Sequence, residues 1–188
     1  MTHAPLPAML AQRTQALCQA FGRIQRERMD GVPVLNQQLQ VQAVGFELQP
    51  QAGDSAGPPM ALGVLVTPWF MNLIRLPLQA GPVVSNVGPL PPGTNAPRDL
   101  GAQTLDFIGA HEPLLGDGAW AQYELCSLYS PMFEFADQAA AVATAHEVLR
   151  LLRLPPAQPV VVPAPASAPP QPARRGFLLG RSAGGAPR

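Results

Sequence analysis

The apolar positions near the start of the chain repeat at helical spacing. Over residues 10–29 they fall on one stripe, while arginine and glutamine fill the other faces, so this segment is predicted to be an amphipathic helix. Gly31 and then Pro33 follow, in the order that commonly ends a helix. The loop 32–38 is expected to turn the chain, with Asn36 as its pivot. The predicted inward stripe consists of Leu10, Leu17, Phe21, Ile24 and Arg28.

Shorter apolar runs in the middle of the chain predict strands. Residues 41–49 alternate between apolar and polar, with a change of phase at Gly45 that indicates a β-bulge. Residues 61–67 form a nearly continuous apolar run, as expected for a central strand buried on both faces, and Pro68 ends it. Three further segments have the length and alternation of strands, namely residues 73–78, 103–108 and 123–128.

A second helix is predicted over residues 139–154, and Pro155 follows its last turn. Two starts are compatible with the sequence. Ser130 followed by Pro131 resembles an N-cap with proline at the first helical position, and Asp137 is an alternative N-cap. The predicted inward stripe consists of Val142, Ala145, Leu149 and Leu152.

The order of helix, strands and helix predicts the fold class α+β. The predicted strands lie too close together in the sequence for the helical crossovers that parallel pairing requires. We therefore expect a mostly antiparallel sheet of about four strands, flanked by N- and C-terminal helices. Irregular loops are expected at residues 50–59 and 81–97, and a turn at residues 116–118.

Proline and charge divide the chain into two parts. The sequence has 24 prolines among 188 residues, and they are concentrated in residues 155–188. We therefore predict a domain at residues 1–154 and a disordered proline-rich tail at residues 155–188. The domain has a net charge of −4 (8 Arg against 12 acids), and the tail has +4 from its 4 arginines. An acidic domain argues against nucleic acid as a partner, because phosphate binding needs clustered cations.

The sequence also predicts a reduced, cytoplasmic protein. Cys18 and Cys126 are its only cysteines, too few for a disulfide framework. The N-terminal residues lack the basic region and apolar core of a secretory signal. The most apolar stretch, residues 60–78, contains Pro68 and Arg75, so we expect it to form core strands and not a membrane span.

Residues typical of catalysis or metal binding are sparse. The three histidines are scattered, and His111 beside Glu112 lacks the second histidine of the zinc-helix motif. The glycine and serine patterns of nucleotide-binding loops and nucleophile elbows are absent from the sequence. We therefore expect no metal, no cofactor and no catalytic residue.

Cys126 is the residue on which an alternative function would depend. As a nucleophile or thiol ligand, it would make the chain a small thiol-dependent enzyme or redox protein. On the predicted strand 123–128 it points to the same side as Glu124. A nearby carboxylate raises the pKa of a thiol and disfavours the reactive thiolate. A small, half-buried structural cysteine is the simpler interpretation.

Two segments combine aromatic residues with methionine. They are residues 67–72 (TPWFMN) and residues 126–135 (CSLYSPMFEF). Structurally, the first suggests a tight corner and the second a helix start with a hydrophobic staple. Functionally, they suggest two neighbouring surfaces whose aromatic and methionine side chains bind a partner. The predicted partner-binding residues are Trp69, Phe70, Met71, Asn72, Cys126, Ser130, Met132 and Phe135.

These segments also carry a family resemblance. The strings TPWFMN and SPMFEFADQAA, with RMDGVP and VQAVGF before them, resemble the HybE/HupJ family of [NiFe]-hydrogenase assembly chaperones. The similarity covers about residues 21–154 and is nearest to HupJ/HoxT-like members, which serve uptake hydrogenases.

The resemblance implies a cytoplasmic accessory protein that is not an enzyme. Its expected partner is the precursor of the iron–sulfur small subunit, which it would protect or proofread before twin-arginine export. The large subunit and a rubredoxin-like accessory protein are further expected partners. The family supplies no catalytic residue that can be transferred to this sequence.

The end of the chain carries a short motif of its own. Arg174, Arg175, Phe177 and Leu178 form an RRGFL string, which is similar to the core of a twin-arginine export signal. Its C-terminal position excludes export of this chain by that string. One hypothesis is that the string mimics a signal and docks on a site that reads signals. The alternatives are a flexible tail that happens to contain arginines, or a proline-rich bridge that recruits another protein.

Overall fold

Two α-helices, two short 3₁₀-helices (Pro113–Leu115 and Gly118–Ala121) and six strands lie in the part of the chain that the computed structural model describes, residues 5–50, 57–79, 88–101 and 103–153. The chain divides into two units, Met1–Ala157 and Gln158–Arg188, and every described residue belongs to the first. The RRGFL string, whose docking role is a hypothesis, therefore lies outside the described residues. The elements are α1 (Leu6–Arg28), β1 (Gln42–Leu48), β2 (Met60–Val66), β3 (Met71–Pro77), β4 (Asn95–Leu100), β5 (Gln103–His111), β6 (Gln122–Tyr129) and α2 (Gln138–Leu152).

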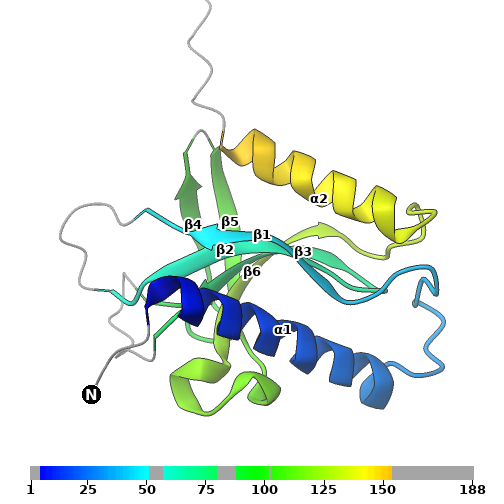
Figure 1. The fold of residues 1–188 in the computed structure, drawn as a ribbon, viewed down its shortest axis with the longest axis horizontal. Coiled ribbons are helices and arrows are strands. Elements are labelled where there is room, and N and C mark those ends of the chain that lie inside the picture. Colours follow the sequence, from blue (N-terminus) through cyan, green and yellow to red (C-terminus); the bar gives the residue numbers. More distant parts are fainter. Residues whose placement is uncertain (1–4, 51–56, 80–87, 102, 154–188) are drawn as a thin grey trace, which may run out of the picture. The chain divides into compact units, whose positions relative to one another are not determined.

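The strands form one antiparallel sheet in the order β1-β2-β3-β6-β5-β4, so that β1 and β4 are its edges. The helices α1 and α2 lie on opposite faces of this sheet (Figure 1). β2 and β3 are central and buried on both faces, which confirms the prediction for residues 61–67. The α+β fold class and the antiparallel sheet are confirmed as well.

Each face of the sheet has its own hydrophobic core, because a helix covers it. On one face, α1 contributes Leu17, Ala20 and Phe21, which pack with side chains of β2 and β3. On the other face, α2 packs against the sheet through its buried residues. These are Ala141, Ala145, Leu149 and Leu152, three of which belong to the predicted stripe.

The β-bulge predicted at Gly45 is confirmed. The register between β1 and β2 shifts between Val44 and Glu47. Gly45 has φ 61°, in the left-handed region that favours glycine. The bulge lets Phe46 lie directly over Gly63 of β2, where a Cβ would come within 2.3 Å of the Phe46 ring. The phase change in the sequence therefore reports a real insertion in the strand.

The expected number of strands is too low. We predict about four, and the sheet has six. β4 begins at Asn95, inside the segment 81–97 that is predicted to be an irregular loop. Pro97 lies within this strand, and proline is tolerated there because β4 is an edge whose N–H groups need not all be paired.

The second helix starts at the later of its two predicted positions. Asp137 is the N-cap, and its carboxylate accepts a hydrogen bond from the Ala140 N–H at 2.8 Å. Ser130 is not a helix cap, because residues 130–136 form an irregular connection, and the Ser130–Pro131 peptide bond is cis. This connection brings Met132 and Phe135 into the core instead.

An arginine of α1 fixes the connection between β5 and β6. Arg13 is buried, and its guanidinium donates to the carbonyl oxygens of Pro77 (3.1 Å), Leu115 (3.1 Å) and Trp120 (2.8 Å). It also lies 4.7 Å from the Trp120 ring centroid. Burial lowers the pKa of Arg13 to about 10, so it remains charged at neutral pH.

No helix in the described part of the chain has both the length and the apolar character that a membrane span requires.

Candidate functional site

The two aromatic segments meet at one end of the domain. The connection before β1, the β2–β3 turn and the connection before α2 all lie at the right-hand side of Figure 1. Asn36 joins them. Its N–H donates to the Pro68 oxygen at 2.8 Å, and its Nδ2 donates to the carbonyls of Met132 (3.0 Å) and Phe135 (2.7 Å). Asn36 therefore holds the two aromatic segments next to each other, whereas the sequence predicts only that it turns its own loop.

Thr67 fixes the geometry of the β2–β3 turn. Its buried hydroxyl accepts from the N–H groups of Trp69 (3.3 Å) and Phe70 (2.9 Å) and donates to the Phe70 carbonyl (2.9 Å). The Trp69 and Phe70 rings meet edge to face at 5.4 Å, and Phe70 packs in the same way on Phe21 of α1 at 5.7 Å. Both aromatic side chains are half-buried and held in place.

Four residues of these two segments are called the aromatic corner here: the half-buried Trp69 and Phe70, and the exposed Ser130 and Phe133. Ser130 is exposed, and its hydroxyl donates to the Trp69 carbonyl at 3.4 Å. Phe133 is 60% exposed, the largest value among the exposed large apolar residues described. The sequence prediction missed it, because an irregular segment has no periodicity that separates inward from outward positions.

Four of the predicted partner-binding residues are core residues instead. Met71 and Met132 are fully buried, and Asn72 and Phe135 nearly so. Phe135 packs edge to face on Tyr129 at 5.1 Å. These four residues support the corner from within, and a partner cannot reach them in this conformation.

Cys126 points to the α2 side of the sheet, as does Glu124, in agreement with the predicted alternation. The thiol is free and half-buried. Burial raises its pKa, and the Asp106 carboxylate raises it further. The expected direction is therefore right, but the expected cause, Glu124, is wrong.

Glu124 has a structural role. It is fully buried, and its carboxylate accepts from Arg98 Nη2 (2.6 Å), Arg98 Nε (3.1 Å) and the Leu90 N–H (3.0 Å). It also forms an ion pair with Arg75. The carboxylate thus ties β3, β4 and β6 together. The only signal for this in the sequence is a carboxylate at an inward position of a strand.

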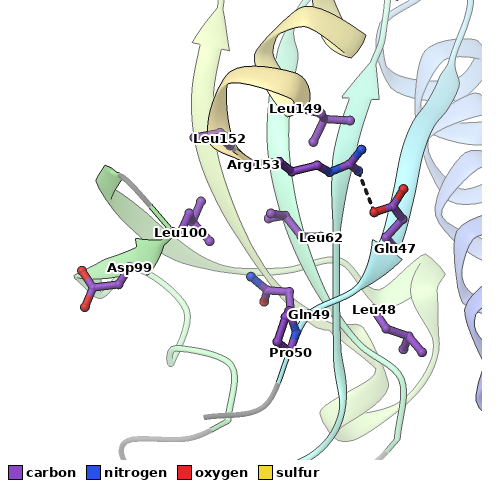
Figure 2. A pocket seen from close by; sticks show the side chains of 11 residues that line it. Glu47, Leu48, Gln49, Pro50, Leu62, Asp99, Leu100, Leu149, Leu152 and Arg153 are labelled. Atoms are coloured by element: carbon purple, nitrogen blue, oxygen red, sulfur yellow. Dashed lines mark ion pairs between the residues drawn. The ribbon is translucent and has the colours of Figure 1, made fainter. Parts of the chain in front are cut away.

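A cavity of about 460 Å³ lies at the other end of α2, between the ends of β1 and β4. Figure 2 shows Leu152 and Arg153 on its α2 side and Leu62 on its sheet side. At its rim, Arg153 and Glu47 form an ion pair at 2.9 Å, with side chains 51% and 62% exposed. Leucine side chains in the lining suit an apolar group. The lining contains no thiol or histidine.

Metal chemistry finds no support in the described part of the chain. No group of three or more His, Cys, Asp or Glu side chains there is arranged to hold a metal ion. Cys18 on α1 is a second free, half-buried thiol, and burial raises its pKa. What the geometry offers is a rigid aromatic surface, with no assembled catalytic group among these residues.

The chain is similar to several known proteins. A protein HoxT from Cupriavidus necator is 46% identical over 172 residues, which cover 90% of this chain and 89% of that protein. A hydrogenase expression/formation protein HupT from Azotobacter chroococcum is 36% identical and covers 89% of this chain and 95% of its own length. A probable rubredoxin HupJ from Rhodobacter capsulatus is 36% identical, but this chain covers only 47% of it.

One solved structure shares the fold. The solution structure of HybE from Escherichia coli matches with a TM-score of 0.50 at 22% identity and covers 92% of this chain and 91% of its own. The family model described as "[NiFe]-hydrogenase assembly, chaperone, HybE" matches residues 12–180. This chain therefore belongs to the HybE family of [NiFe]-hydrogenase assembly chaperones.

Proposed function

We propose that this chain binds the precursor of the iron–sulfur small subunit of a [NiFe]-hydrogenase in the cytoplasm and protects or proofreads it before twin-arginine export. The aromatic corner is the proposed contact surface. The observation that carries this proposal is the 60% exposure of Phe133, in a connection whose Met132 and Phe135 carbonyls bind Asn36, the residue that also binds the β2–β3 turn. Exposed aromatic groups of this kind commonly anchor protein partners.

The rigidity of the corner favours binding. Thr67 and Asn36 hold the two halves of the surface in the absence of a partner. Binding then costs little ordering of the chaperone's own side chains. The chaperone must also release the unfinished subunit. A small contact surface with few anchoring side chains suits such a transient complex.

Two further partners belong to the proposal. The large subunit is a second client, because assembly of the enzyme requires both subunits. A rubredoxin-like accessory protein is the other, supported by the name of the longer relative from Rhodobacter capsulatus, probable rubredoxin HupJ, of which this chain covers 47%. We propose no catalytic activity for this chain. The raised pKa of Cys126 gives no support to a thiol enzyme.

An affinity capture from cells that make the hydrogenase tests the proposal. The tagged full chain is expected to recover the small-subunit precursor, identified by mass spectrometry. Phe133→Ala should reduce the recovery strongly. Leu151→Ala is the matched control, because Leu151 is 41% exposed on α2 and lies outside the corner. If no hydrogenase subunit is recovered from a cell that is maturing the enzyme, the proposal is wrong.

A further inference from the structure

The edge strand β1 has backbone groups that point away from the sheet. The Gln49 N–H donates to the Met60 oxygen at 2.9 Å, so Met60 turns its backbone groups toward β1. Hydrogen-bonded positions alternate along an antiparallel strand, so Val64 also faces β1. Val64 pairs with Val44. It follows that Val44 bonds to β2, whereas its neighbour Ala43 presents its N–H and C=O to the open edge.

Cys18 supports this assignment independently. Burial raises the pKa of the Cys18 thiol, and the neighbouring Ala43 backbone N–H lowers it and so partly offsets that effect. The Ala43 N–H therefore points out of the sheet toward α1. Sulfur is a weak acceptor, so a carbonyl oxygen would be a better partner for this N–H.

An open groove runs beside this edge. It has a volume of about 630 Å³ and lies between α1 and β1, within the size range of sites that hold ligands. Thr14 in its wall has a buried hydroxyl without a hydrogen-bond partner in the described part of the structure. The groove is lined by Pro7, Leu10, Ala11, Thr14, Gln15, Cys18, Val41, Gln42, Ala43 and Phe46, none of which carries a charge.

The edge has hydrogen-bond partners on either side of Ala43. Before β1, the Gln40 N–H donates to the side chain of Gln138 at 2.9 Å. Near the bulge, Arg153 Nη2 donates to the Gly45 carbonyl at 3.5 Å. Between these positions, Ala43 faces the groove. Natural sheets protect an edge with proline, charge or a bulge. β4 has Pro97 and β1 has the bulge at Gly45, but Ala43 itself has neither proline nor charge beside it on the strand.

We propose that an extended, uncharged apolar segment of the immature client adds to this edge as an additional strand beside β1. The outward-facing N–H and C=O of Ala43 suit an extended backbone, because a strand presents N–H and C=O groups to such an edge. The uncharged lining selects apolar side chains, since a charged one would lose its hydration without gaining a partner. This inference rests on the proposed function and deepens it.

The groove and the aromatic corner lie along the same helix. Phe21, which holds Phe70 in the corner, follows Cys18 by three residues on α1, a rise of about 4.5 Å. A client that is still partly unfolded offers both an extended segment and exposed apolar side chains. The two surfaces therefore bind different features of the same unfinished protein.

Amide hydrogen exchange, resolved by residue, tests the proposal on the full chain with and without the purified small-subunit precursor. The Ala43 amide should exchange at least tenfold more slowly in the complex. Gln15→Arg places a bulky charge in the groove and should weaken precursor binding at least tenfold. Gln19→Arg is the matched control, since both glutamines are exposed on α1 but only Gln15 lines the groove. Ala11→Arg serves as a second groove variant if Gln15→Arg does not fold.

The possible outcomes separate this inference from the function on which it rests. A complex that forms with unchanged exchange at Ala43 overturns strand addition and leaves the client assignment intact. Protection that rises with the concentration of the chain alone identifies a second copy as the occupant and also overturns the inference. If neither the small-subunit nor the large-subunit precursor forms a complex, both the inference and the proposed function fail.

Discussion

Single polar side chains join segments that are far apart in this sequence. Asn36 binds the carbonyls of Met132 and Phe135 and so fixes the aromatic corner. Glu124 binds Arg75, Arg98 and the Leu90 N–H on the other side of the domain. These groups are largely withdrawn from water. The loss of one partner therefore leaves the remaining polar groups without a hydrogen bond or a counter-charge.

The Glu124 cluster leads to a stability prediction. Glu124→Gln leaves two arginines facing a neutral amide, and the free energy of unfolding should fall by about 3–5 kcal/mol. Urea denaturation measures this change. Glu47→Gln is the control, because the exposed Glu47–Arg153 pair should contribute less than about 1 kcal/mol. Equal losses in the two variants would show that the buried cluster does not stabilise the fold.

The thiol of Cys126 leads to a prediction about pH. Its pKa is raised by burial and by Asp106, so at pH 7 it carries less thiolate than an ordinary cysteine. In a Cys18→Ser variant, where Cys126 is the only thiol, the alkylation rate should rise with pH to a midpoint above that of the same thiol in the unfolded chain. The urea-unfolded chain supplies the reference. A midpoint below that of the unfolded chain would restore thiol chemistry as a candidate function.

At the scale of secondary structure, the periodic segments were predictable and the edge strand β4 was not. The two helices, the bulge in β1 and the buried β2 follow from apolar spacing, which tertiary packing does not override. β4 was missed because an exposed edge strand that contains Pro97 has no buried face to impose alternation. The start of α2 remained open in the sequence, since the choice between Ser130 and Asp137 depends on packing of the connection 130–136.

Two glycines allow the packing of these elements to be tested. Gly109 of β5 lies under the connection that precedes β4, and a Cβ there would come within 2.2 Å of the Pro91 oxygen. Gly109→Ala should therefore lower the free energy of unfolding by about 1–3 kcal/mol. Gly22→Ala in α1 meets its nearest atom, Arg26 Nη1, at 3.6 Å and should raise it by about 0.5–1 kcal/mol. Thermal melts of both variants check the signs. A stabilising Gly109→Ala would mean that this crossing is not tight.

At the scale of the whole molecule, the candidate site was predictable in place but not in its exposed members. The sequence identifies the two segments that meet at the corner. It cannot separate Met132, which is buried, from Phe133, which is exposed, because neighbouring residues of an irregular connection follow no fixed pattern of exposure. The groove beside β1 was also missed, because an open strand edge is a property of strand order and not of any local pattern.

The dissociation constant of the purified complex measures whether the aromatic corner binds the small-subunit precursor. The measurement compares the unaltered full chain with Phe133→Ala and Leu151→Ala. We predict that Phe133→Ala weakens binding at least tenfold, about 1.4 kcal/mol, and that Leu151→Ala changes it less than about twofold, or 0.4 kcal/mol. Equal affinities for all three proteins would show that the aromatic corner is not the contact surface.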